Sequence, residues 1–176
     1  MESNVTLFHI TVPVFRRNLE NLRAMLVKAE THLLECHQNE AELMTTQLAS
    51  DMFPFVQQVQ STVGTATYAV GTLAEVTPLR FPDTETSLLE LQLRIDRALE
   101  WLERFNVNDL TAAGGRSCIL PALGGVRASL PSDRFATEYA LPNFFFHLTM
   151  SYALLRQFGV PLGKSDYIGP LPRAPV

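Results

Sequence analysis

The sequence predicts an all-α protein, and a four-helix bundle is the simplest architecture for it. Two observations lead to this prediction. Apolar residues recur at spacings of three and four in four segments, and glycines and prolines break the chain between those segments. The chain of 176 residues is long enough for one domain with its own core. We expect the helical domain at residues 1–169, followed by a proline-rich tail at 170–176.

The first helix is expected from Thr11 to Cys36. Thr11 can cap its N-terminus, and Pro13 then falls in the first turn, where a missing N–H is tolerated. An apolar stripe follows on one face, made of Phe15, Leu19, Leu22, Leu26, Ala29 and Leu33. A short connecting helix is expected over residues 39–48.

The second long helix is expected to begin near Asp51, which can cap it, with Pro54 in its opening turn. The sequence carries almost no charge between Asp51 and Glu75, which is typical of a helix buried on more than one side. Gly64 and Gly71 lie seven residues apart and suggest the close approach of another helix, in this chain or in a partner. Ordinary small residues in a crowded bundle are the simpler alternative.

The third helix lies within residues 83–105, and its start has two alternatives. Asp83 and Glu85 could place acid at the positive end of the helix dipole, or Ser87 and Glu90 could form a capping box one turn later. The predicted buried stripe is Leu88, Leu91, Ile95, Leu99 and Leu102. The predicted polar face carries Arg94, Asp96, Arg97, Glu100 and Glu103.

A long irregular insertion is expected between the third and fourth helices. Residues 106–132 contain four glycines and two prolines, which exclude a long helix. Within them, residues 117–120 and 126–130 are candidates for a small β-hairpin around Gly124–Gly125. The fourth helix is expected from Leu141 or Pro142 to Phe158, with Gly159 as its stop and an extended segment after it.

Composition disfavours several classes of protein. The chain has 14 basic and 18 acidic side chains, a net charge of −4, which disfavours a nucleic acid as partner. No segment approaches the ~18 apolar residues that span a bilayer, and the N-terminus does not read as a secretory signal. Cys36 and Cys118 could form one disulfide, but two free thiols are the simpler interpretation. We expect a cytoplasmic protein that has no membrane partner.

The residues best suited to chemistry lie on the fourth helix. Asn143, His147 and Ser151 are spaced by four and form a polar line along an otherwise apolar helix, and Tyr152 lies beside this line. Buried polar groups need partners, so His147 is either a satisfied core residue or part of the floor of an internal pocket. Its ordinary pKa lies near neutrality, which makes it the best candidate here for proton transfer.

Four motifs carry a resemblance to a known family. The sequence contains DMFP with Gln58 and Val59, DTETS at residues 83–87, PNFFFH at residues 142–147 and GKSDYIG at residues 163–169. These resemble the motifs of an uncharacterised family within the DinB/YfiT-like superfamily of four-helix bundles, and HLTMSYALLRQFGVP resembles the last helix of that superfamily. The resemblance spans about residues 5–169 and implies a DinB-like four-helix bundle.

The resemblance also bears on metal binding, because many DinB-like bundles are metalloproteins. It aligns His147 with the second histidine of the metal site, Asn143 with the first, and Gln58 or Gln57 with the third ligand; we prefer Gln58. Zinc and nickel ions in proteins are coordinated by imidazole, thiolate or carboxylate groups, and two neutral amides are weak ligands. We therefore expect no metal and no other cofactor, but a pocket on which Gln58, Asn143 and His147 converge.

Three functions stay open at this point. The first is a small-molecule-binding protein that could be a metal-independent isomerase, cyclase or lyase. In it His147 would be the catalytic acid or base, and Gln58, Asn143, Ser151 and Tyr152 would bind the substrate. The second, implied by the resemblance, is a metal-dependent thiol transferase or isomerase. The third is a non-catalytic binding protein. A homodimer is expected, because weakly charged helices in such bundles often pair.

Overall fold

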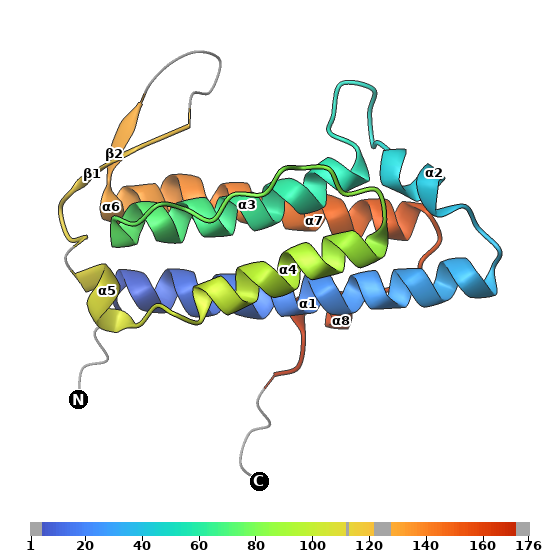
Figure 1. Ribbon diagram of the computed structural model, residues 1–176, viewed down its shortest axis with the longest axis horizontal. Coiled ribbons are helices and arrows are strands. Elements are labelled where there is room, and N and C mark those ends of the chain that lie inside the picture. The colour runs from blue at the N-terminus through green and yellow to red at the C-terminus, as the bar shows by residue number, and fades with distance from the viewer. Residues whose placement is uncertain (1–4, 112, 122–127, 172–176) are drawn as a thin grey trace, which may run out of the picture.

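The computed structural model describes residues 5–111, 113–121 and 128–171 and confirms the all-α bundle. Its four long helices are α1 (Leu7–Glu35), α3 (Phe55–Ala74), α4 (Leu88–Leu102) and α7 (Leu141–Gln157). The shorter elements are α2 (Glu40–Thr45), α5 (Val107–Thr111), β1 (Ser117–Ile119), β2 (Ser129–Pro131), α6 (Ser132–Arg134), the π-helical turn η1 (Phe135–Ala140) and α8 (Lys164–Ile168). Helix α1 packs on α4 and α3 packs on α7, and contacts between α3 and α4 and between α1 and α7 close the bundle (Figure 1).

The core contains the predicted stripe of α1 and, apart from the half-buried Leu99, that of α4. Phe15 of α1 and Phe144 of α7 are fully buried, and their ring centroids lie 4.8 Å apart. Phe55 at the start of α3 and Phe135 in η1 are also fully buried. Burying one such side chain stabilises the fold by about 1.5–3 kcal/mol. The bundle therefore needs no disulfide, and both cysteines are free thiols.

Helix α1 begins one turn earlier than the sequence predicts. Its N-cap is Thr6, and Thr11 lies inside the helix, where its hydroxyl donates to the carbonyl of Leu7 at 2.6 Å. Pro13 is therefore an interior residue and not a first-turn residue. Leu7 packs against the core, and the free energy gained from this apolar burial offsets the cost of the backbone hydrogen bond that Pro13 cannot donate.

Helix α3 begins at Phe55 with Pro54 as its N-cap, so the predicted cap at Asp51 is wrong. Asp51 is exposed in the preceding turn, and the backbone N–H of Phe55 bonds to the carbonyl of Thr46 at 2.9 Å. The close approach expected at Gly71 comes from Pro78 in the following loop and not from another helix. An added Cβ at Gly64 would meet no atom within 4 Å.

Helix α4 uses the later of its two predicted starts. The Ser87 hydroxyl accepts from the backbone N–H of Glu90 at 3.2 Å, and the Glu90 carboxylate accepts from the backbone N–H of Thr86 at 2.6 Å. Asp83 and Glu85 do not cap the helix, because both pair with Arg94. The prediction that Arg94 lies on the polar face is also wrong: its side chain is 4% exposed.

The insertion contains the predicted hairpin strands. Strands β1 and β2 pair antiparallel with Ser117 opposite Pro131, and residues 122–127, which hold the expected Gly124–Gly125 turn, lie outside the described residues. The last helix extends further upstream than predicted, because α6 and η1 lead directly into α7. In η1 the Leu141 N–H bonds to the carbonyl of Ala136, five residues back, which is the wider spacing of a π-turn.

The segment after α7 is not simply extended, because α8 docks on α1. The Asp166 carboxylate accepts from the Lys28 ammonium at 2.5 Å, and the Asn21 amide donates to the carbonyl of Tyr167 at 3.1 Å. Arg17 donates to the carbonyl of Pro170 at 3.0 Å, so the proline-rich tail begins against the bundle. None of the helices in the described ranges is both long and apolar enough to cross a membrane.

The two glycines of α3 give a matched stability test. Gly71→Ala places a Cβ 2.9 Å from the Cα of Pro78, so we expect a loss of about 1–3 kcal/mol in the free energy of unfolding. Gly64→Ala meets open space, and we expect a gain of about 0.5–1 kcal/mol from reduced chain entropy. Urea denaturation of the two variants measures both values. Equal effects at the two positions would contradict the packing described here.

Candidate functional site

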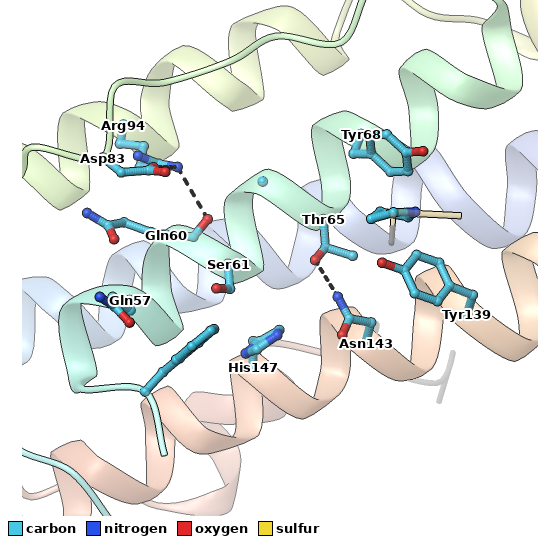
Figure 2. A pocket seen from close by; sticks show the side chains of 13 residues that line it. Gln57, Gln60, Ser61, Thr65, Tyr68, Asp83, Arg94, Tyr139, Asn143 and His147 are labelled. Atoms are coloured by element: carbon cyan, nitrogen blue, oxygen red, sulfur yellow. Dashed lines mark hydrogen bonds and ion pairs between the residues drawn. The ribbon is translucent and has the colours of Figure 1, made fainter. Parts of the chain in front are cut away.

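A cavity of about 450 Å³ lies between α3 and α7 and opens to solvent (Figure 2). Phe53, Tyr68 and Tyr139 form aromatic parts of its wall. His147 and Asn143 line it from α7, and the polar residues of α3 line it from the other side. Its mixture of aromatic surface and a few polar groups is typical of a small-molecule site.

His147 is held in one orientation by Gln58. The Gln58 amide nitrogen donates to the carbonyl of Phe53 at 3.1 Å, so the amide oxygen is left to face His147 Nδ1 at 2.8 Å. An amide oxygen can only accept, which puts the proton of the neutral imidazole on Nδ1 and leaves the lone pair on Nε2. The ring of Phe53 stacks on the imidazole, with centroids 6.2 Å apart and 11° between the planes.

Burial sets the charge of this imidazole. His147 is half-buried, and desolvation lowers its pKa below the ordinary value of 6.5. No carboxylate hydrogen-bonds to it among the described residues, and its partner Gln58 is a neutral amide. The side chain is therefore a neutral base at physiological pH.

The other predicted site residues occupy three different environments. Asn143 lines the cavity, and its amide donates to the Thr65 hydroxyl at 2.8 Å. Gln58 is 1% exposed and lies behind His147, whereas its neighbour Gln57 lines the cavity. Ser151 is fully buried and donates to the carbonyl of His147 at 2.9 Å, which supports the helical turn that carries the imidazole.

Tyr152 is also outside the cavity wall. Its ring packs edge-to-face on Tyr167 of α8, with ring centroids 5.7 Å apart. The structure thus brings Asn143 and His147 together in one wall, with Gln58 as a support behind them. Ser151 and Tyr152 are not brought into that wall.

Arg94 forms a charged cluster at one end of the cavity that the sequence analysis did not predict. Its guanidinium donates to Asp83 at 2.6 Å and to Glu85 at 2.9 Å, and its Cζ lies 4.4 Å from the centroid of the Phe81 ring. Gln60 of α3 donates to the second oxygen of Glu85 at 2.8 Å. The DTETS segment forms the end of the loop before α4, and these contacts hold it against α3 and α4.

The pKa shifts agree with this geometry. Burial alone would raise the pKa of Glu85, but the hydrogen bonds from Arg94 and Gln60 outweigh it, so the pKa is lowered and Glu85 is ionised. Burial raises the pKa of Tyr139, and the nearby Tyr68 raises it further. Tyr139 is therefore a neutral phenol at physiological pH.

Helical spacing on α3 could have identified more of this wall. Gln57, Ser61, Thr65 and Tyr68 recur at intervals of four, four and three, and all four line the cavity. The low charge of α3 indicates burial and by itself does not reveal this polar face. Helical spacing could not identify Asp83 and Arg94 as cavity residues. Asp83 lies in a loop and Arg94 on a helix, so no single helical pattern contains both.

The donor set fits a metal ion poorly. Gln58 is committed to His147 and Phe53, and Asn143 is committed to Thr65, which leaves His147 as the one strong ligand at the aligned positions. Within the described residues, no three His, Cys, Asp or Glu side chains gather as a metal site would require. We therefore derive no chemical step through a metal.

Comparisons with known proteins place this geometry in context. The family described as "Domain of unknown function (DUF1993)" matches residues 7–168. A crystal structure of a DinB family member protein from Shewanella denitrificans is similar, with a TM-score of 0.89 and 37% sequence identity over 96% of each chain. No curated protein matches the chain.

The lowered pKa of His147 predicts a pH dependence of stability. Between the ordinary value of 6.5 and the lower folded-state pKa, the unfolded chain takes up a proton that the folded chain does not. The free energy of unfolding should therefore fall as the pH drops through this window. His147→Gln removes the titrating group and should remove this part of the pH dependence in urea denaturation. An NMR titration that places the His147 midpoint above 6.5 would contradict the burial argument.

Metal content tests the donor-set argument. The purified protein should hold clearly less than one zinc or nickel ion per chain, because one imidazole and two committed amides bind such ions weakly. Elemental analysis after gel filtration measures this content. About one tightly held ion per chain would overturn the argument. Its loss in His147→Gln would then identify the imidazole as a ligand.

Proposed function

We infer the function from two premises: this chain belongs to the DUF1993 family of DinB-like proteins, and its cavity carries a neutral imidazole. We propose that the protein binds a small molecule in the cavity between α3 and α7. His147 accepts a proton, or a hydrogen bond, from the bound molecule through Nε2. The observation that supports this most is the Gln58 contact, which keeps the Nδ1 side of the ring occupied.

The proposed chemistry is proton transfer without a metal, as in an isomerase, cyclase or lyase. A general base must be unprotonated at the working pH and works best when its pKa lies near that pH. The lowered pKa of His147 keeps the imidazole unprotonated. Asn143 and Gln57 are placed to hold the substrate from the two sides of the cavity. A substrate hydroxyl suits His147 better than a carbonyl, because a hydroxyl can donate to Nε2.

We also propose a homodimer in a reducing compartment such as the cytoplasm. Leu89 and Leu93 lie one turn apart on α4 and are 55% and 53% exposed, which favours contact with a second copy. Cys36 and Cys118 are both free thiols, in keeping with a compartment that does not form disulfides.

Gly64 offers a direct test of the cavity. Because a Cβ at this position meets no atom within 4 Å, Gly64→Leu should place its side chain in the cavity without disturbing α3. Benzyl alcohol is a suitable probe, and it should shift the NMR signals of His147 in the wild type and in Gly64→Ala but not in Gly64→Leu. A folded Gly64→Leu protein that binds the probe as the wild type does would contradict the proposal.

Substitution of His147 distinguishes a chemical role of this residue from a structural one. Once a substrate is known, His147→Ala should abolish turnover while the bundle stays folded, with a cost of about 1–3 kcal/mol for leaving the buried Gln58 oxygen unpaired. Turnover and circular dichroism are measured on the same sample. Full activity in a folded His147→Ala protein would end the acid–base proposal.

A further inference from the structure

We infer that the ligand of this cavity is a cation, a small molecule with a protonated amine on an apolar body. This inference rests on the proposed function and narrows it to one class of ligand. It follows from three features of the cavity: its balance of charge, the state of Arg94 and the aromatic wall (Figure 2).

The charged end of the cavity carries an excess of negative charge. Asp83 and Arg94 are the charged side chains among the described residues of the wall, and Glu85 lies directly behind Arg94. Asp83 and Glu85 share the Arg94 guanidinium, so this cluster of three side chains carries one net negative charge. The exposed Arg97 borders Glu85 only from another adjoining cavity and does not line this one. Glu85 is 10% exposed and is saturated by Arg94 and Gln60, whereas Asp83 is 60% exposed and can reach a ligand.

An arginine in a cavity often binds an anionic ligand, but the guanidinium of Arg94 is already bonded to side chains and backbone of this protein. One terminal nitrogen donates to Glu85, and the other donates to Asp83 and to the carbonyl of Gln60. Its Nε has no partner among the described residues, but it is shielded from solvent and cannot meet a ligand. Because the Arg94 side chain is 4% exposed and that of Asp83 is 60% exposed, a ligand carboxylate would meet the Asp83 carboxylate first.

The backbone at Asp83 supports a dedicated position for this carboxylate. Asp83 has a φ of 52°, in the left-handed region that few residues other than glycine adopt. Aspartate tolerates this region better than most side chains, and the ion pair with Arg94 helps to hold it there. The conformation directs Asp83 to the edge of the cavity, where it also borders the adjoining cavity.

The rest of the wall suits a cation with an apolar body. Phe53, Tyr68 and Tyr139 line the cavity with aromatic rings. Aromatic rings attract ammonium groups and pack against apolar groups. His147 is neutral, so it does not repel a cation, and its Nε2 can accept from an ammonium N–H. Exposed Arg80 borders Asp83 only from the adjoining cavity, where solvent screens its charge.

Three probes of one shape and different charge test the inference. Benzylamine, benzyl alcohol and benzoate are titrated separately into the full chain at neutral pH, and the dissociation constants are read from NMR shifts of cavity residues. We expect benzylamine to bind roughly tenfold more tightly than benzyl alcohol, because a charged hydrogen bond is stronger than a neutral one, and benzoate to bind weakest.

Asp83→Asn and Glu100→Gln are the matched variants. Asp83→Asn keeps an oxygen for Arg94 but removes the excess charge, so it should lower the affinity for benzylamine roughly tenfold and leave that for benzyl alcohol unchanged. Glu100 is exposed on α4 outside the cavity wall, and Glu100→Gln should change neither affinity. Thermal unfolding checks that both variants are folded.

The possible outcomes separate this inference from the proposed function. Benzyl alcohol or benzoate binding as tightly as benzylamine would overturn the cation inference and leave the cavity proposal standing. The cation inference is also overturned if Asp83→Asn and Glu100→Gln weaken the binding of benzylamine equally. No binding of any probe up to its solubility limit would contradict the proposed function itself.

Discussion

The structure depends on one constraint: the buried polar side chains of an almost uncharged helix must all find partners. Gln58, Gln60, Thr65 and Thr67 of α3 are each at least nine-tenths buried. Each of the four has a partner outside α3: His147 and Asn143 on α7, Glu85 in the loop before α4, and the carbonyl of Leu79. An unpaired buried polar group costs about 1–3 kcal/mol, so these bonds select how α7 and the loop sit on α3.

The cavity is a consequence of the same arrangement. The bonds made by residues 58–67 of α3 hold α7 and the charged loop in place, and the absence of a side chain at Gly64 leaves space between them. The inner residues Gln58 and Glu85 orient the outer ones, His147 and Arg94, that border this space. Support from a second layer of side chains preorganises such a wall for binding.

The sequence supported the bundle much better than it supported the details of the site. The four helical periods predicted the four long helices because local spacing alone decides which face is apolar. Spacing cannot show that Arg94 is buried, since its burial depends on carboxylates from a loop that the helical pattern does not include. Spacing also cannot show which of Gln57 and Gln58 contacts His147. That depends on how His147, stacked on Phe53, meets α3 in the folded chain, and no local pattern in the sequence encodes this contact.

The proposed function requires that Gln58 holds His147 as a neutral base with its lone pair on Nε2. The most direct measurement is a long-range ¹⁵N–¹H correlation spectrum of the imidazole at neutral pH, which distinguishes the two tautomers and the charged form. We predict a proton on Nδ1 and an unprotonated Nε2 in the wild type, and loss of this preference in Gln58→Leu. A protonated Nε2, or a charged imidazolium, in the wild type would contradict it.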